Sequence, residues 1–266
     1  MTDSVNQAER RVALKTDYHD CYDVWLDRPG SADVCFSRLA GDSWSVHRTQ
    51  MFELFDVLGM FHPLYQKSAH FDASESIVVY SDPFSHCGEG KWLMTGEDAL
   101  RGGLVESFAS LFIPDFPGLS YRYFVAAGHG TWFEHWSTED WRSNCGDGDL
   151  SPLSEDRGKL LNLPDIEAAC RILRNPVYAI DFVARKVEGG VQLLAIDWNP
   201  APRLAGTPAH DAMVARWGSN QGLARAISSA VVEVAELAGV DFIDNNQIHS
   251  SIRHNAAPGC LGDDHV

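Results

Sequence analysis

Residues 177–199 read VYAIDFVARKVEGGVQLLAIDWN, and this stretch determines how the rest of the chain is interpreted. Two apolar segments flank a Glu-Gly-Gly turn, a pattern that predicts a β-hairpin. Asp181 interrupts the first strand, whereas Asp197 and Asn199 stand two apart at the end of the second. Because side chains two apart on a strand share a face, Asp197 and Asn199 point the same way, and the hairpin can bring Asp181 alongside them.

Two carboxylates and one amide oxygen on a single face form a ligand set made only of oxygen. Such a set suits Mg²⁺, which retains water and takes further ligands from substrate phosphates. A single aspartate at a strand end more often caps a turn or faces water. Three such groups among aliphatic residues, followed by Pro-Ala-Pro, favour a magnesium site at Asp181, Asp197 and Asn199.

The bulk composition describes a globular protein and excludes several classes of partner. The 266 residues can bury a substantial core, and 45% of them are hydrophobic. A net charge of −16 disfavours nucleic acid and anionic lipid surfaces as partners. No run approaches the roughly 18 apolar residues of a membrane helix, and the polar N-terminus lacks the apolar centre of a signal peptide. Six scattered cysteines favour reduced thiols, and we therefore expect a cytoplasmic protein without a membrane anchor.

The apolar periodicity predicts an alternation of strands and helices with no repeat and no linker, hence one bilobed α+β unit. A polar lead-in over 1–15 is expected to fray. Strands are predicted twice within 18–39 and at 76–83, 86–94, 111–116, 121–127 and 131–136. Helices are predicted within 45–63, 96–111, 163–175 and 219–239, and a loop or mobile insertion at 137–158.

The end of the hairpin resembles the C-terminal signature of the ATP-grasp superfamily. The resemblance lies in Ile-Asp-Phe around Asp181 and in the acid-x-Asn-Pro sequence that begins at Asp197. In that superfamily the corresponding groups hold two magnesium ions on the phosphates of ATP, which implies this role for Asp181, Asp197 and Asn199. Asp197 stands where the family usually has the longer Glu. The following NPAPRLAG resembles the loop that shapes the acceptor site, and Arg203 within it could hold a substrate carboxylate or phosphate.

The order of the upstream elements extends the resemblance over about residues 43–210. The helix within 45–63 resembles the family's early helix, with His47 or Arg48 in place of its lysine. Tyr80 stands where the next strand usually carries another lysine. HCGEGKW (86–92) resembles the phosphate-covering loop, LFIPDF (111–116) the adenine-contacting hinge, and SYRYF (120–124) the strand that places an arginine near the transferred phosphate. The resemblance thereby implies nucleotide contacts from Tyr80, Gly88, Gly90, Lys91, Phe112, Ile113, Asp115 and Arg122.

The fold implied by this resemblance is α+β and ATP-grasp-like, with two α+β lobes whose antiparallel sheets clasp a nucleotide. The expected organisation is a short N-terminal segment with possible strands (1–42), an N-lobe (43–118), a C-lobe with the metal-binding hairpin (119–245) and a polar tail (246–266). A homodimer could form through the apolar face of the helix within 219–239.

The activity implied is that of an ATP- and Mg²⁺-dependent carboxylate–amine ligase. A small-molecule or peptide carboxylate would become an acyl phosphate, which an amine then attacks, with Arg122, Arg203 and Lys91 as the catalytic residues. Residues 88–90 and 143–149 are candidate lids over the site. Two alternatives stay open: a small-molecule kinase, and a degenerate protein that binds nucleotide or a partner without turnover, which Tyr80 would favour.

Other catalytic motifs fit the sequence less well. The glycine turn at 86–91 lacks the spacing and the final Ser or Thr of a P-loop, and no G-x-S-x-G elbow is present. His129 and His135 with Glu134 could bind zinc, but strand alternation places Glu134 on the opposite face, so packing or substrate contact is favoured for both histidines. Cys87 has no identifiable partner for a nucleophilic role.

Overall fold

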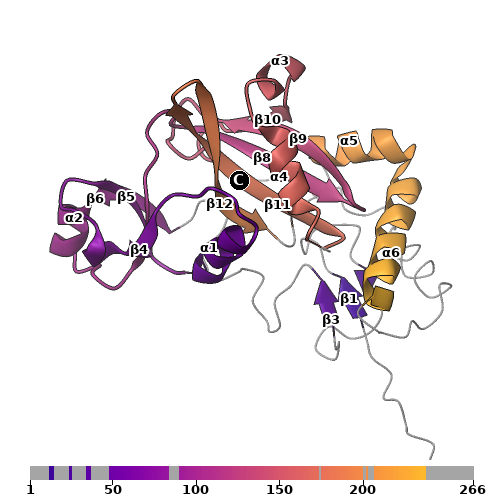
Figure 1. The fold of residues 1–266 in the computed structure, drawn as a ribbon, viewed down its shortest axis with the longest axis horizontal. Helices are drawn as coiled ribbons and strands as arrows, with labels where there is room; N and C mark the ends of the chain where they lie inside the picture. Colours follow the sequence, from indigo (N-terminus) through magenta and orange to yellow (C-terminus); the bar gives the residue numbers. More distant parts are fainter. Residues whose placement is uncertain are drawn as a thin grey trace, which may run out of the picture.

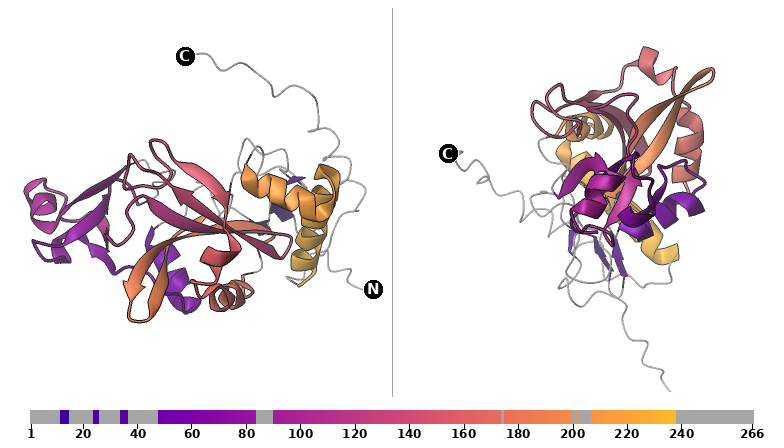
Figure 2. Two further views of the ribbon diagram at one scale, coloured as in Figure 1. Left: turned by 90° about the horizontal axis from the view of Figure 1, so that it is seen from above. Right: turned by 90° about the vertical axis from the view of Figure 1, so that its left-hand side faces the viewer.

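The computed structural model describes residues 12–14, 24–25, 34–36, 48–83, 90–173, 175–199, 202 and 207–237. Two antiparallel sheets form two lobes that lie side by side along the long axis of the molecule (Figures 1 and 2). A third, small sheet joins the short strands β1 (Val12–Leu14), β2 (Val24–Trp25) and β3 (Val34–Phe36). Within the described residues, no helix combines the length and apolar character needed to cross a membrane.

The first lobe is a four-stranded sheet backed by a short helix. Its strand order is β4-β7-β5-β6, with β4 at Tyr65–Lys67, β5 at Ser76–Tyr80, β6 at Lys91–Thr95 and β7 at Phe108–Leu111. Helix α2 (Gly96–Arg101) and the 3₁₀ turn η2 (Ser68–His70) cover one face. Ile77 and Val79 of β5 pack there against Ala99 of α2. The alternate residues Val78 and Tyr80 face the other lobe.

The second lobe is a five-stranded antiparallel sheet with strand order β10-β9-β8-β11-β12. Its strands are β8 (Leu119–Ala126), β9 (His129–Trp136), β10 (Asp149–Pro152), β11 (Val177–Val187) and β12 (Gly190–Asn199). Its helices are α1 (Arg48–Val57), α3 (Glu155–Gly158), α4 (Leu163–Cys170), α5 (Pro208–Trp217) and α6 (Asn220–Leu237). In Figure 1, α1 lies against β12, and α5 and α6 lie at the end of the molecule opposite the first lobe.

The two faces of the five-stranded sheet have different neighbours. One face forms the main core, where Tyr121, Tyr123 and Phe182 pack against Phe52 and Phe55 of α1. Strand alternation sends the intervening residues of the same strands to the opposite face, which carries Arg122, His135 and Asp181 as well as the buried Phe124 and Phe133. His135 and Asp181 on this face line the cleft between the two lobes.

The β11–β12 hairpin has the strands that its sequence predicts. A two-residue turn, Glu188-Gly189, joins Val187 to Gly190, and Gly189 adopts a φ of 82°, a conformation that favours glycine. A β-bulge interrupts the register just after Asp181, and the backbone N–H of Ala195 there donates to the carbonyl oxygen of Phe61 at 2.8 Å. The hairpin is thereby tied to the segment that follows α1.

Several predicted elements are confirmed and others are wrong. The strands within 18–39, the early helix, β5, β6, β8, β9, α4 and α6 lie where the sequence predicts them. The single helix over 96–111 is wrong, because α2 ends before Gly102-Gly103 and residues 108–111 form β7. Residues 112–116 are an irregular connection, where a strand was predicted.

The remaining differences concern segments that the sequence marked as irregular. Residues 12–14 of the polar lead-in form β1, and the predicted loop at 137–158 contains β10 and α3. Helix α5 was not predicted, although Thr207 caps its start by accepting a hydrogen bond from the N–H of His210, and a proline follows. Residues 84–89, which include most of the glycine turn predicted at 86–91 and of the candidate lid at 88–90, lie outside the described residues, as does the tail beyond 237.

Candidate functional site

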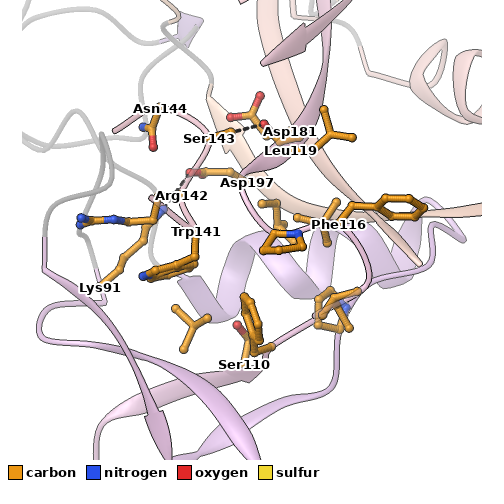
Figure 3. Close-up of a pocket in the computed structure, with 18 of the residues that line it drawn as sticks. Lys91, Ser110, Phe116, Leu119, Trp141, Arg142, Ser143, Asn144, Asp181 and Asp197 are labelled. Carbon is orange, nitrogen blue, oxygen red and sulfur yellow. Dashed lines mark hydrogen bonds and ion pairs between the residues drawn. The ribbon is translucent and has the colours of Figure 1, made fainter. Parts of the chain in front are cut away.

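A cleft with about 860 Å³ of empty space opens between the two sheets (Figure 3). Tyr80, Lys91 and Ser110 line it from the four-stranded sheet, and Asp181 and Asp197 line it from the five-stranded sheet. The connection 111–117 and the segment 141–144 complete the wall.

Asp197 lies between two cationic side chains from the first half of the chain. Its Oδ1 is 2.9 Å from Nη1 of Arg48, at the start of α1, and its Oδ2 is 3.7 Å from Nζ of Lys91. The Arg48 side chain is only 3% exposed, and its guanidinium carbon lies 5.1 Å from the centre of the Tyr80 ring. The Lys91 ammonium is 5.7 Å from the same ring. Tyr80 thus has two cations beside it at the position where the family resemblance leads one to expect a lysine.

These contacts shift the pKa values of both partners toward their charged forms. Burial alone would lower the pKa of Arg48, but the Asp197 carboxylate and Tyr80 outweigh it and raise that pKa above its usual value. Burial would raise the pKa of Asp197, but Arg48 and Lys91 outweigh burial and lower it. Asp197 is therefore a carboxylate at neutral pH.

Asp181 forms the second ion pair of the cleft, with Arg122 on the neighbouring strand. The register places Arg122 of β8 directly opposite Asp181 of β11, and Asp181 in turn opposite Asp197 of β12. The guanidinium binds in a bidentate manner, with Nε–Oδ1 and Nη2–Oδ2 distances of 2.6 and 2.7 Å. Three cations therefore surround two carboxylates, and this cluster carries a positive excess that suits an anionic ligand.

The shared face predicted for Asp181, Asp197 and Asn199 is confirmed by the register. Asn199 lies opposite Ala179, two positions before Asp181, so the three side chains share one face of the sheet. No group of three or more His, Cys, Asp or Glu side chains in the described part of the chain is arranged to hold a metal. A magnesium site here would need the Asn199 amide and ligand oxygens beside the two carboxylates. Their oxygen chemistry fits Mg²⁺, although each carboxylate already has a cationic partner.

The other predicted site residues fall into three groups. Tyr80, Lys91, Phe112 and Ile113 line the cleft. Arg122 does not line it, but its guanidinium binds Asp181, which does. Gly90, with a φ of 62°, and Asp115 do not line it. Gly88 and Arg203 lie outside the described residues.

His135 lines the cleft, whereas its proposed zinc partners lie elsewhere. Burial and the nearby Arg122 lower the pKa of His135, which favours the neutral imidazole. The His129 ring lies 5.2 Å from the ring of Trp217, at the other end of β9. Glu134 forms an ion pair with Arg157. These three side chains therefore do not converge on a common metal.

The segment 137–148 contributes a wall that the sequence did not reveal. Asp147 accepts hydrogen bonds from Ser137 Oγ at 2.6 Å and from the backbone N–H groups of Thr138 and Glu139 at 2.8 and 3.3 Å. Four consecutive residues, 141–144, line the cleft, and Ser143 Oγ is 2.6 Å from Ser120 Oγ of β8. The region predicted as a lid is thus cross-linked to itself and to the sheet.

No family model matches this sequence, and no curated protein matches it. Solved structures do match the fold. D-alanine–D-alanine ligase from Bacillus anthracis complexed with ATP is 12% identical, with a TM-score of 0.51 over 73% of this chain and 68% of that chain. A second structure of that ligase is 11% identical, with a TM-score of 0.51 over 73% and 69%. This similarity shows that the chain has the fold of the ATP-grasp superfamily.

Proposed function

Because the chain has the ATP-grasp fold, we propose that it is an ATP-dependent ligase that activates a carboxylate as an acyl phosphate and joins it to an amine. The observation that carries this proposal is the cluster of Arg48, Lys91 and Arg122 around Asp181 and Asp197. Partly buried cations attract a polyphosphate, and paired carboxylates are suitable ligands for the magnesium that accompanies it.

The residues of the cluster have different roles in the proposed phosphoryl transfer. Such transfer requires positioning and charge neutralisation more than covalent help from the protein. Lys91 and Arg122 would bind phosphate oxygens, and Arg122 would stabilise the charge on the moving phosphoryl group. Asp181, Asp197 and Asn199 would hold Mg²⁺, whose charge neutralises the phosphates when it is bound.

Buried Arg48 has a different position from the other two cations. It approaches Asp197 from the start of α1, and its guanidinium lies beside the Tyr80 ring. We assign it the role of keeping Asp197 ionised and aligned. Arg48 is therefore a positioning residue in this proposal.

The acceptor substrates are proposed as a carboxylate and an amine of small-molecule or peptide size. Arg203, in the loop after β12, remains our candidate for holding the substrate carboxylate. The ATP-bound structural neighbour is a D-alanine–D-alanine ligase, and its name supports this class of reaction. At 12% identity it does not identify the two substrates.

A second candidate function is nucleotide binding without turnover. The buried Tyr80, 5% exposed, favours it, because no phosphate can contact an ammonium at that position. A small-molecule kinase would use the same cleft but transfer phosphate to a stable acceptor.

The first experiment measures thermal stabilisation by Mg·ATP, followed by phosphate release with panels of carboxylates and amines. A ligase releases ADP and free phosphate only when both substrates are present, whereas a kinase releases ADP without free phosphate. Asp197→Asn should abolish the thermal shift, and the exposed Asp72→Asn should retain it. If the wild-type protein shows no shift with Mg·ATP, the proposed ATP site is wrong.

A further inference from the structure

We propose that the open edge of β12 binds an extended, basic peptide segment as an additional strand of the five-stranded sheet. The site lies on the core side of the β11–β12 hairpin, which projects beyond the rest of the sheet (Figure 2). The cleft with Asp181 and Asp197 lies on the opposite face of the sheet. The proposal therefore concerns a partner, and it does not depend on the proposed ligase activity.

The first argument is the unpaired backbone of β12. This strand is the last in the sheet order, so only β11 pairs with it among the described residues. The N–H of Ala195 points away from β11 and donates to the carbonyl oxygen of Phe61 at 2.8 Å. Backbone groups of successive residues in a strand turn to opposite sides, so those of Leu193 and Val191 point outward as well. No hydrogen bond joins these outward groups to another part of the described chain.

The spacing of these groups fits a second extended backbone. Leu193 and Val191 are two residues apart, which is about 6.8 Å along a strand and equals the two-residue repeat of any neighbouring strand. A peptide that lies beside β12 meets the donors and acceptors of both residues. Phe61 already occupies the adjacent position in this way at Ala195. An exposed edge of this kind is a template for strand addition.

An apolar groove, here called the β12 groove, runs beside the open edge. Residues 59–61, Phe182 and the residues 191–193 line it on one side, and Ile166 and Ala169 of α4 line it on the other. Phe61 is 64% exposed, an unusual state for so large an apolar side chain. Every second side chain of an added strand points to the face that carries Val191 and Leu193. Alternate apolar residues of the peptide would therefore enter the β12 groove.

The charge at the β12 groove favours a basic peptide over a second copy of this chain. Asp165, in the first turn of α4, lines the groove and accepts a hydrogen bond from the side-chain amide of Asn162. No cation of the described residues pairs with Asp165. Lys186, on the same face of the hairpin, has its ammonium 5.2 Å from the centre of the Phe116 ring. A lysine or arginine of the peptide can pair with Asp165, whereas a second copy with a net charge of −16 would bring like charges together.

The experiment measures binding of a labelled peptide to the full chain by fluorescence anisotropy. The probe is the capped heptapeptide Lys-Thr-Val-Thr-Val-Thr-Lys, whose lysines and valines share one face in an extended conformation. The first comparison probe has every internal amide N-methylated, which prevents backbone pairing. The second has norleucine in place of both lysines. The unmodified peptide should bind saturably, and the N-methylated peptide should bind at least about tenfold more weakly, because pairing by backbone hydrogen bonds is lost.

Two pairs of measurements separate the backbone from the charge. Val191→Pro removes an outward N–H, which an edge strand tolerates, and should weaken the peptide about tenfold. Val191→Thr keeps that N–H and should retain binding. Asp165→Asn should weaken the lysine peptide about threefold, as expected for an exposed ion pair, and leave the norleucine peptide unchanged. Urea denaturation of each variant checks that the fold is retained.

Three results would overturn the proposal. In the first, the wild type binds the unmodified and N-methylated peptides equally or binds neither, a comparison that needs no variant to fold. In the second, a folded Val191→Pro protein binds the peptide as the wild type does. In the third, sedimentation shows a dimer that Val191→Pro dissociates, which makes a second copy the occupant of the edge. Stabilisation by Mg·ATP is measured separately, so each result leaves the proposed function to its own test.

Discussion

The two halves of the cleft are built by different kinds of backbone. Arg122, Asp181 and Asp197 lie in register across three adjacent strands, so the hydrogen-bond ladder of the sheet fixes their positions. Phe112 and Trp141 lie on two irregular segments, held by individual hydrogen bonds. The ionic half is therefore positioned by the fold, and the aromatic half by a few local contacts.

This difference determines what a substitution can do in each half. A change in the ionic half alters charge without moving the strands, because the ladder does not depend on those side chains. A change in the aromatic half can release a segment of backbone while the sheet stays intact. We therefore expect large electrostatic effects in the first half and local, structural effects in the second.

The largest effect is expected for Asp197→Ala. The substitution removes a proposed magnesium ligand and leaves the buried Arg48 guanidinium without its carboxylate. Mg·ATP stabilisation should be abolished, and the free energy of unfolding should fall by about 2–3 kcal/mol. This loss is below the roughly 3–5 kcal/mol of a fully buried pair, because Asp197 keeps 24% of its side-chain surface exposed. Urea denaturation at neutral pH measures the loss.

The double variant Arg48→Met/Asp197→Leu provides the control for this ion pair. Removing both charges should recover most of the lost stability but none of the nucleotide binding. If Asp197→Ala were no less stable than the exposed Asp72→Ala, Arg48 would not depend on Asp197.

The next effect is expected for Arg122→Ala. Its bidentate contact with Asp181 places the guanidinium at the cleft, where the proposed reaction develops negative charge. Turnover, measured by phosphate release, should fall about 10²-fold, while ATP affinity falls much less. Arg185→Ala is the matched control, because Arg185 is an exposed residue of β11 that contacts Gln192. The opposite pattern, with lost affinity and intact turnover, would contradict the assigned role.

The sequence predicted most of the ionic half, because its two aspartates lie on strands whose apolar residues alternate regularly. The alternation of β11 and β12 around a glycine turn fixes which side chains share a face, and the sequence alone therefore predicts that Asp181 and Asp197 lie together. The resemblance added Arg122 and Lys91. The contact of Arg48 with Asp197 was not predicted, because nothing in a local pattern indicates which face of β12 the start of α1 approaches.

The aromatic half was not predicted, because the residues that form it show neither helical nor strand periodicity in the sequence. The Ser-, Asp- and Gly-rich residues of 137–148 are typical of a loop, and the sequence does not reveal that Asp147 collects hydrogen bonds from three neighbouring residues. The end of α2 before β7 is easier to predict from the sequence. Gly102-Gly103 marks it in the sequence, and Gly103 adopts a φ of 74° that a helix cannot continue through.

A smaller effect is expected for metal binding in the absence of nucleotide. Asp181 and Asp197 are already paired with guanidinium and ammonium groups, so a divalent cation must compete with them. Phosphates would draw Lys91 and Arg122 away and release the carboxylates. Mn²⁺ should therefore bind at least about tenfold more tightly with a non-hydrolysable ATP analogue than alone, a coupling of about 1.4 kcal/mol. Electron paramagnetic resonance of free Mn²⁺ measures both affinities.

Lys91→Met tests the origin of this coupling. The variant removes one competing cation, so Mn²⁺ alone should bind it more tightly than it binds the wild type. An unchanged or weaker affinity for Mn²⁺ alone would indicate that the ion pairs do not limit metal binding.

The smallest effect on global stability is expected for Asp147→Ala, which acts on the aromatic half alone. The variant removes the acceptor that holds 137–139, so backbone amides of 137–148 should exchange hydrogen faster while the unfolding midpoint changes little. Hydrogen bonds from Ser137 and Thr138 lower the pKa of Asp147, so its contribution is present above the unfolded pKa and lost as the pH falls through the folded value. Protection of the 137–148 amides in the wild type, measured relative to their intrinsic exchange rates, should therefore persist at pH 4 and be lost only in stronger acid. If exchange in this segment were equally fast in both proteins at pH 7, Asp147 would not fix the wall.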